Sequence, residues 1–200
     1  MSLTEPLATH PNGAVSPAPR IVDDAFFARP TLEVARALIG CTLRHRDTAG
    51  VIVEVEAYCG DAASHHVTRP RTGAIMGTTH GRIYLYSIYG MHRCLNVTTD
   101  EHGPGAVLFR ALEPTEGLGS MAHRRGSDDV RALCSGPAKL VEALAVDSGI
   151  GSKRFLDHFE LDGRTDPLEI ATGPRIGISA AVELPWRLAL RGSRFLSRKI

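Results

Sequence analysis

The chain has 200 residues, of which 43% are hydrophobic, and its formal net charge is +1. This length suits one ordinary domain with a real core, and the nearly even charge argues against a strongly basic nucleic-acid-binding protein. The four cysteines form no CxxC pair, which argues against a zinc ribbon and favours free thiols in a reducing compartment.

The first twenty residues are rich in Pro, Ala, Ser and Thr and show no periodicity. They predict a disordered tail over 1–20, followed by a single domain over 21–200. The tail lacks the apolar run of a signal peptide, and no stretch of the chain is long enough to span a bilayer. We therefore expect a cytoplasmic protein without membrane contacts.

Hairpins and helices alternate along the rest of the chain. A helix is predicted to begin near Pro30 and to end at Gly40. The long loop expected over 59–82 is of a length that is often functional. We expect an α+β fold, a single domain with a mainly antiparallel curved β-sheet, flanking helices and a protruding β-hairpin. The predicted elements are helices at 31–39, 114–125 and 137–146, strands at 41–46, 51–58, 83–89, 92–98 and 106–112, and short strands from Leu168 on.

One predicted strand carries two carboxylates and a tyrosine. In the run VIVEVEAY over 51–58, side chains alternate between faces, so the three valines are expected to enter the core. Glu54, Glu56 and Tyr58 then share the opposite face, at the end of a strand and before a long loop. This arrangement is a candidate site, although an ordinary solvent-facing strand surface gives the same pattern.

Three of the four tyrosines lie within six residues, in the run IYLYSIYGMH. Tyr84 and Tyr86 share one strand face, whereas Tyr89 lies beside the turn at Gly90. Aromatic rings next to basic residues are what base stacking needs, and a tyrosine at a hairpin tip can act as a wedge between base pairs. A tyrosine-rich core strand is the alternative, because tyrosine favours strands.

Two stretches of the chain contain no acidic residue, namely 62–99 and 184–200, and both contain several arginines. If the fold brings them together, they could form one positive face. Asn96 could read a base edge, and Arg110 could hold a phosphate or a carboxylate. Three histidines and an aspartate crowd the loop at 59–82 without a recognised ligand spacing, so we expect no metal and no other cofactor.

Seven strings of this sequence closely resemble the alkyladenine (3-methyladenine) DNA glycosylase family, and the resemblance is to a bacterial member. They occur in the family's order and run from Phe26 to Ser197, which is nearly the whole chain outside the tail. Ordered strings of this length are far more specific than any one motif. The strings are FFARPTLEVARALIG, IVEVEAY, AASH, IYLYSIYGMHRCLN, GAVLFRALEP, LCSGPAKL and RGSRFLS.

The resemblance implies two catalytic residues. In IVEVEAY the glutamate before Ala-Tyr matches the general base, so Glu56 takes that role and Glu54 does not. In FRALEP, Arg110 matches the residue that helps to hold the attacking water and the phosphate of the flipped nucleotide. We expect a lone carboxylate at the rim of an aromatic slot wide enough for a purine.

The resemblance also implies residues that bind the base. Tyr58 and Tyr86 match the two aromatic residues that stack on opposite faces of the flipped base, and His65 matches a histidine that lines the same pocket. Asn96 matches the residue that screens bases by clashing with the amino group of guanine. Contacts to the DNA itself are expected from Tyr89, which would fill the gap in the duplex, and from Met91, His92, Arg110 and Lys139.

The activity implied is a base-excision repair glycosylase that flips alkylated or deaminated purines out of double-stranded DNA and hydrolyses the N-glycosidic bond. The expected bases are 3-methyladenine, 7-methylguanine, hypoxanthine and ethenoadenine. No lysine lies between Met1 and Ala138, so we expect no Schiff base and no strand cleavage. We expect a monomer that is associated with the nucleoid when it is bound to DNA.

Two other readings remain open at this stage. A non-catalytic binder of damaged DNA or structured RNA would use the same aromatic hairpin and basic stretches, and it would bind without releasing a base. A metal-dependent hydrolase of small molecules would use Glu54, Glu56 and the loop histidines, and it would lose its activity on chelation.

Overall fold

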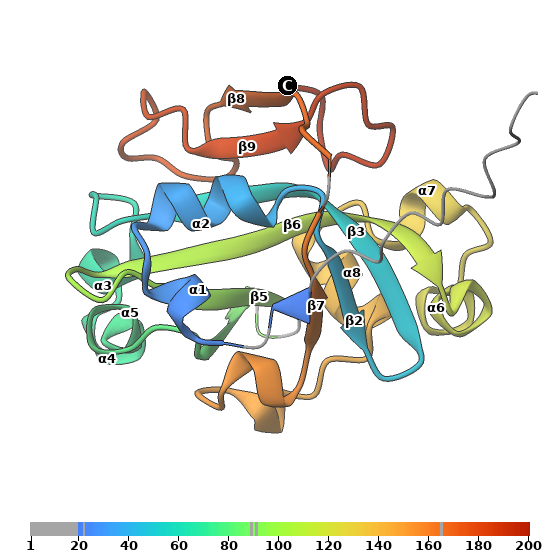
Figure 1. The fold of residues 1–200 in the computed structure, drawn as a ribbon, viewed down its shortest axis with the longest axis horizontal. Helices are drawn as coiled ribbons and strands as arrows, with labels where there is room; N and C mark the ends of the chain where they lie inside the picture. Colours follow the sequence, from blue (N-terminus) through green and yellow to red (C-terminus); the bar gives the residue numbers. More distant parts are fainter. Residues whose placement is uncertain (1–19, 22, 89, 91, 165) are drawn as a thin grey trace, which may run out of the picture.

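A single antiparallel sheet organises the chain in a computed structural model, which describes residues 20–21, 23–88, 90, 92–164 and 166–200. Within these ranges the sheet has nine strands in the order β1-β7-β2-β3-β6-β5-β4, and β9 joins β3 and β8 joins β9. The sheet is curved and open, which confirms the predicted α+β class (Figure 1). The strands are β1 (Arg20–Ile21), β2 (Thr42–His45), β3 (Thr48–Tyr58), β4 (Ile83–Ile88), β5 (His92–Thr99), β6 (Gly105–Glu116), β7 (Glu160–Asp162), β8 (Ile170–Gly173) and β9 (Arg187–Leu190).

Short helices surround this sheet. Figure 1 shows α3 to α5 at one end of the long strand β6 and α6 at the other. Among the described residues no helix is long and apolar enough to cross a membrane. The helices are α1 (Ala25–Ala28), α2 (Thr31–Leu38), α3 (His65–Thr68), α4 (Pro70–Gly73), α5 (Ile75–Thr78), α6 (Leu118–Arg125), α7 (Val130–Leu133), α8 (Pro137–Ala143), η1 (Ser148–Ile150) and η2 (Phe155–Asp157), the last two being 3₁₀ helices.

Helix α2 forms where the sequence predicts it. It follows Pro30, buries Val34, Ala35 and Leu38 in the main core, and packs on β3 and β6. It ends before Gly40, whose φ of +87° lies in the left-handed region that favours glycine. The spacing of its apolar side chains is therefore what anchors this helix to the sheet.

Strand β3 departs from the predicted alternation. Its pairing with β6 shifts register between Ile52 and Val55, as in a β-bulge. Ile52 and Val55 both enter the main core, whereas Val51 is only half-buried. The expectation that Val51 faces the core is therefore wrong, because the bulge changes the phase of the strand.

Other boundaries also differ from the predictions. The segment 59–82 is not a continuous loop, since it contains the one-turn helices α3, α4 and α5. Strand β6 continues to Glu116, so the helix expected from 114 begins only at Leu118, and α7 was not predicted. Arg20, assigned to the tail, pairs in β1 with Asp162 of β7, and the rest of that tail lies outside the described residues.

Candidate active site

Four adjacent strands bring polar and aromatic side chains into one row. Across β4, β5, β6 and β3, Tyr84 pairs with Asn96, Asn96 with Leu108, and Leu108 with Glu56. Residues two apart on one strand share a face, so Tyr86 and Tyr58 extend this row on its two outer strands. Strand pairing alone therefore places side chains that are far apart in sequence on the same face of the sheet.

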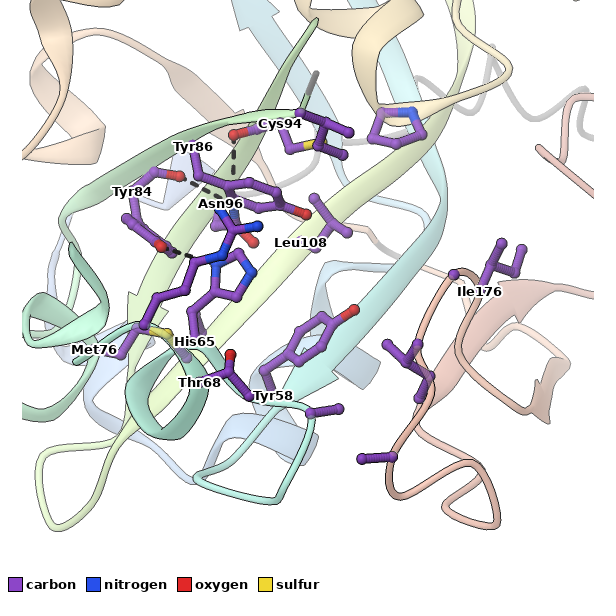
Figure 2. A pocket seen from close by; sticks show the side chains of 18 of the residues that line it. Tyr58, His65, Thr68, Met76, Tyr84, Tyr86, Cys94, Asn96, Leu108 and Ile176 are labelled. Carbon is purple, nitrogen blue, oxygen red and sulfur yellow. Dashed lines mark hydrogen bonds between the residues drawn. The ribbon is translucent and has the colours of Figure 1, made fainter. Parts of the chain in front are cut away.

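This face forms the wall of a cavity of about 550 Å³. Such a volume lies in the range of sites for small molecules. Strands β3 to β6, helix α3 and the segment 176–180 surround it, as Figure 2 shows. The residues that line it are Tyr58, Ala62, Ala63, His65, Thr68, Arg69, Met76, Tyr84, Tyr86, Ile88, Cys94, Asn96, Ala106, Leu108, Arg110, Pro137, Ile176, Gly177, Ile178, Ser179 and Ala180.

An aromatic cluster occupies one side of the cavity. The ring centroids of His65 and Tyr86 lie 4.4 Å apart at 78°, and those of Tyr84 and Tyr86 lie 5.8 Å apart at 34°. Nδ1 of His65 and the hydroxyl of Tyr84 are 2.9 Å apart, within hydrogen-bond distance. Burial, assisted by the positive charge of Arg69, lowers the pKa of His65 to about 4. The imidazole is therefore neutral at neutral pH and does not repel a cationic base.

Asn96 is held in one orientation beside these rings. Its side chain is buried, and Nδ2 donates to the backbone oxygens of Tyr84, at 3.0 Å, and Cys94, at 3.4 Å. An amide fixed in this way presents a constant shape to the cavity.

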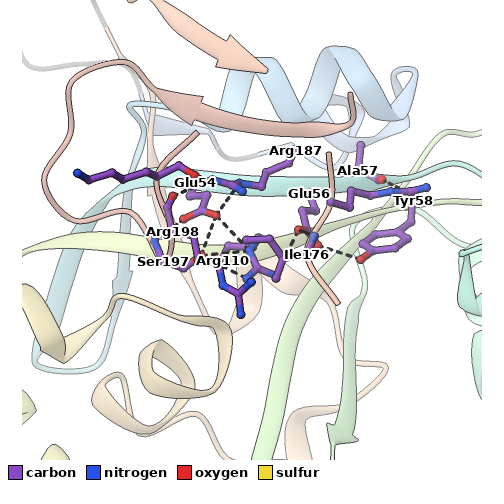
Figure 3. A network of polar contacts seen from close by, with 11 residues as sticks. Glu54, Glu56, Ala57, Tyr58, Arg110, Ile176, Arg187, Ser197 and Arg198 are labelled. Carbon is purple, nitrogen blue, oxygen red and sulfur yellow. Dashed lines mark hydrogen bonds and ion pairs between the residues drawn. The ribbon is translucent and has the colours of Figure 1, made fainter. Parts of the chain in front are cut away.

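Glu56 lies directly behind the cavity wall. Its Oε1 accepts a hydrogen bond from the backbone N–H of Ile176 at 2.7 Å, and its Oε2 accepts one from the hydroxyl of Tyr58 at 2.9 Å. Nη1 of Arg110 is 3.3 Å from Oε1 (Figure 3). Burial raises the pKa of Glu56, while Arg110, the Ile176 N–H and the Tyr58 hydroxyl oppose that rise.

The expectation of a lone carboxylate at the rim is wrong. Glu56 is 0% exposed, and the buried Glu54 reaches the same arginine, with Nε of Arg110 3.1 Å from its Oε1. The reason is that later parts of the chain return over this face, and Ile176 and Ser197 donate to the two carboxylates. Sequence alternation cannot reveal a cover that comes from more than 100 residues away.

The residues expected to contact DNA are only partly described by the structure. Tyr89 and Met91 lie outside the described residues, while Gly90 and His92 are exposed. Lys139 lies in the first turn of α8, two residues after Pro137 of the cavity wall, with Nζ 3.4 Å from Oγ of Ser135. Their roles on DNA stay predictions.

Several site residues were missed by the sequence analysis. Arg69 lines the cavity, with its guanidinium carbon 5.9 Å from the ring centre of Tyr86. Arg175 is buried against the ring of Tyr58, and Ile176 holds Glu56. The acid-free stretch over 62–99 points to Arg69, but neither periodicity nor motif spacing distinguishes Arg175.

A metal site requires several ligating side chains that lie close together. Within the described ranges no three His, Cys, Asp or Glu side chains come close enough together to hold a metal ion. The expectation of a site without metal stays a prediction.

Comparisons with known proteins identify the family of this chain. The family model described as Methylpurine-DNA glycosylase matches residues 25–194. A relative from Rhodopseudomonas palustris (strain BisB18) is 52% identical over 179 residues, covering 87% of this chain and 89% of its own. A relative from Bradyrhizobium diazoefficiens is 47% identical over 180 residues, which cover 87% of this chain and 89% of the relative. A relative from Methanoculleus marisnigri is 44% identical over 188 residues, which cover 88% of this chain and 97% of the relative.

All three relatives bear the name "Putative 3-methyladenine DNA glycosylase". The resemblance found in the sequence is thereby confirmed over most of the chain. The chain belongs to the methylpurine-DNA glycosylase family and is a DNA glycosylase.

Proposed function

We propose that this glycosylase draws a damaged purine out of duplex DNA into the cavity and hydrolyses its N-glycosidic bond with a water activated by Glu56. The observation that carries the proposal is the position of that carboxylate. It contacts Tyr58, Arg110 and Ile176, and all three line the cavity.

The chemistry suits a buried carboxylate. Breaking the bond leaves oxocarbenium-like positive charge on the sugar, and a nearby anion stabilises that charge while it takes a proton from the attacking water. Burial raises the pKa of Glu56 and makes it a stronger base than an exposed carboxylate. Arg110 opposes that rise in the pKa of Glu56 and, on this proposal, helps to hold the water and the phosphate of the flipped nucleotide.

Selection of the base follows from the cavity wall. An alkylated purine is electron-poor and stacks well on electron-rich rings such as those of Tyr58 and Tyr86. His65 is neutral at neutral pH and adds no repulsion. The names of the relatives support 3-methyladenine as a substrate. We include hypoxanthine and ethenoadenine in the proposal because both also lack the amino group of guanine. Because 7-methylguanine keeps the guanine amino group, Asn96 should make it the slowest of the four.

We also propose that the enzyme does not cleave the DNA strand. A lyase step uses an amine that forms a Schiff base with the sugar. No lysine precedes Lys139, and no lysine is among the residues that line the cavity. The reaction then ends with a free base and an abasic site.

The test is base release by Glu56→Gln. The variant and the wild type are incubated in excess, with EDTA present, on a duplex that carries a single hypoxanthine. We expect release to be abolished, while affinity for a duplex with an abasic-site analogue stays unchanged. Glu33→Gln is the matched control, because Glu33 is exposed on α2. This variant should release the base at the normal rate.

Two outcomes would contradict the proposal. Normal release by Glu56→Gln would show that Glu56 is not the base, and loss of wild-type release in EDTA would favour a metal-dependent hydrolase. Quenching the same reactions with borohydride tests the last step, since a covalent protein–DNA adduct would demonstrate a lyase.

A further inference from the structure

A second buried carboxylate lies beside the proposed base without a part in the reaction. Glu54 is 0% exposed, and its Oε1 is 3.1 Å from Nε of Arg110 and 3.0 Å from Nε of Arg187. A buried charge is costly unless it is fully paired, so Glu54 requires these partners. Glu54 and Arg187 therefore form a buried charged group in contact with Arg110.

Ser197 connects the carboxylate to the arginine. Its backbone N–H donates to Oε2 of Glu54 at 2.6 Å, and its hydroxyl donates to Oε1 at 2.8 Å. The same hydroxyl oxygen accepts from Nη2 of Arg110 at 3.2 Å. The hydroxyl thus lies between the anion and the guanidinium and contacts both (Figure 3).

The chain around Ser197 is itself fixed to the sheet. Arg187 of β9 donates from Nη2 to the backbone oxygens of Arg198, at 2.7 Å, and Lys199, at 3.1 Å. In the pairing of β9 with β3, Arg187 stands opposite Glu56. The 197–199 segment (Ser197, Arg198 and Lys199) is therefore attached to the same pair of strands that carries the proposed base.

We propose that the 197–199 segment positions Arg110 for catalysis and that Ser197 is the positioning residue. A guanidinium is planar and rigid, so fixing Nε and Nη2 also fixes the direction of Nη1. Nε and Nη2 of Arg110 contact Glu54 and Ser197, and Nη1 is 3.3 Å from Glu56. This inference rests on the proposed roles of Glu56 and Arg110.

The pH dependence of base release distinguishes positioning from simple stabilisation. Arg110 opposes the rise that burial causes in the pKa of Glu56. If Arg110 turns away, the pKa of Glu56 rises, and the acidic limb of the rate profile moves to higher pH. Other titratable or charged groups around Glu56 are Glu54 and Tyr58 of β3, Tyr86 of β4, Cys94 of β5, Arg187 of β9, and Arg175 from the segment before β9.

The test compares Ser197→Ala with Ser197→Thr, which keeps the hydroxyl. For Ser197→Ala we expect the single-turnover rate on a hypoxanthine duplex to fall roughly ten- to a hundredfold, as small misplacements in active sites do. Its acidic limb should move to higher pH, and its affinity for a duplex with an abasic-site analogue should not change. Ser197→Thr should recover most of the rate. Ser193→Ala, which removes only an acceptor for the N–H of Phe195, should behave as wild type.

Two results would overturn the inference. One is a wild-type rate and pH profile for Ser197→Ala. The other is a slower rate that is explained by a lower melting temperature of the variant, with no shift in the acidic limb of its pH–rate profile. Both leave the proposed function intact as long as Glu56→Gln is inactive, whereas an active Glu56→Gln would refute that function first.

Discussion

The ring of Tyr58 is supported from behind by a buried arginine, and removing that arginine is a demanding test of the site's construction. Arg175 is 4% exposed, and its guanidinium carbon is 4.6 Å from the ring centre of Tyr58 and 5.1 Å from that of Trp186. Nη1 and Nη2 reach the two carboxylate oxygens of Asp61 at 3.0 and 2.6 Å, and Nη1 also donates to the backbone oxygen of Ala57. Arg175→Met removes all of these contacts but keeps an apolar side chain of similar length.

The size of the effect follows from what is left behind. Breaking a buried pair by removing one partner costs about 3–5 kcal/mol, because the other charge stays buried. Burial raises the pKa of Asp61, but Arg175 and the N–H of Ala63 lower it by more, so the carboxylate is charged at neutral pH. Asp61 keeps backbone donors at Cys59 and Ala63, which favours the lower limit of about 3 kcal/mol. For a chain of this size that corresponds to a fall of about 6–12 °C in Tm.

The assay is urea unfolding of Arg175→Met, Asp61→Asn and the double variant. Because Asn removes the unpaired charge, the double variant should be more stable than Arg175→Met, with a coupling of about 2 kcal/mol. Arg191→Met is the matched control, since its ion pair with Glu169 is exposed and should contribute less than about 1 kcal/mol. An unchanged unfolding midpoint for Arg175→Met, or no relief from Asp61→Asn, would refute this reasoning.

Two further variants probe the other side of the cavity. In the folded protein His65 takes up a proton only near pH 4, whereas in the unfolded chain it does so near its ordinary pKa of 6.5. The free energy of unfolding therefore decreases as the pH falls from 6.5 to about 4. Relative to His65→Gln, the wild type should lose about 1 kcal/mol between pH 7 and pH 4.5 in urea unfolding, and a constant difference would contradict this. In Gly73→Ala the new Cβ would lie 2.1 Å from the backbone oxygen of His65, so we expect about 1–3 kcal/mol of destabilisation and slower base release. Gly119→Ala, with no atom within 4 Å, should cost nothing, and equal melting temperatures for the two would count against the clash.

Local rules predicted which side chains of the site share a strand face. Alternation put Tyr84 and Tyr86 on one face, and both line the cavity. It also put Glu54 and Glu56 together, and both contact Arg110. These predictions succeed because residues two apart on a strand share a face, and this relation follows from the local backbone conformation.

Two of the failures arise from non-local contacts, and one arises because the elements are too short. The bulge in β3 depends on its pairing with β6, so the run of valines could not reveal it. The helices within 59–82 have one turn each, which is too short for apolar periodicity to show. Part of the cover over Glu56 comes from Ile176, whose backbone N–H donates to it from 120 residues further along the chain.

The contact between Ile176 and Glu56 has a consequence for the enzyme during its synthesis on the ribosome. A nascent chain that ends before Ile176 and Ser197 would hold Glu54 and Glu56 without the backbone donors that these residues supply. Pairing of distant segments is slow to form during folding, and synthesis proceeds from the other terminus. On the proposed mechanism, a chain that stops before Ile176 lacks the donor that holds Glu56 and should not excise bases.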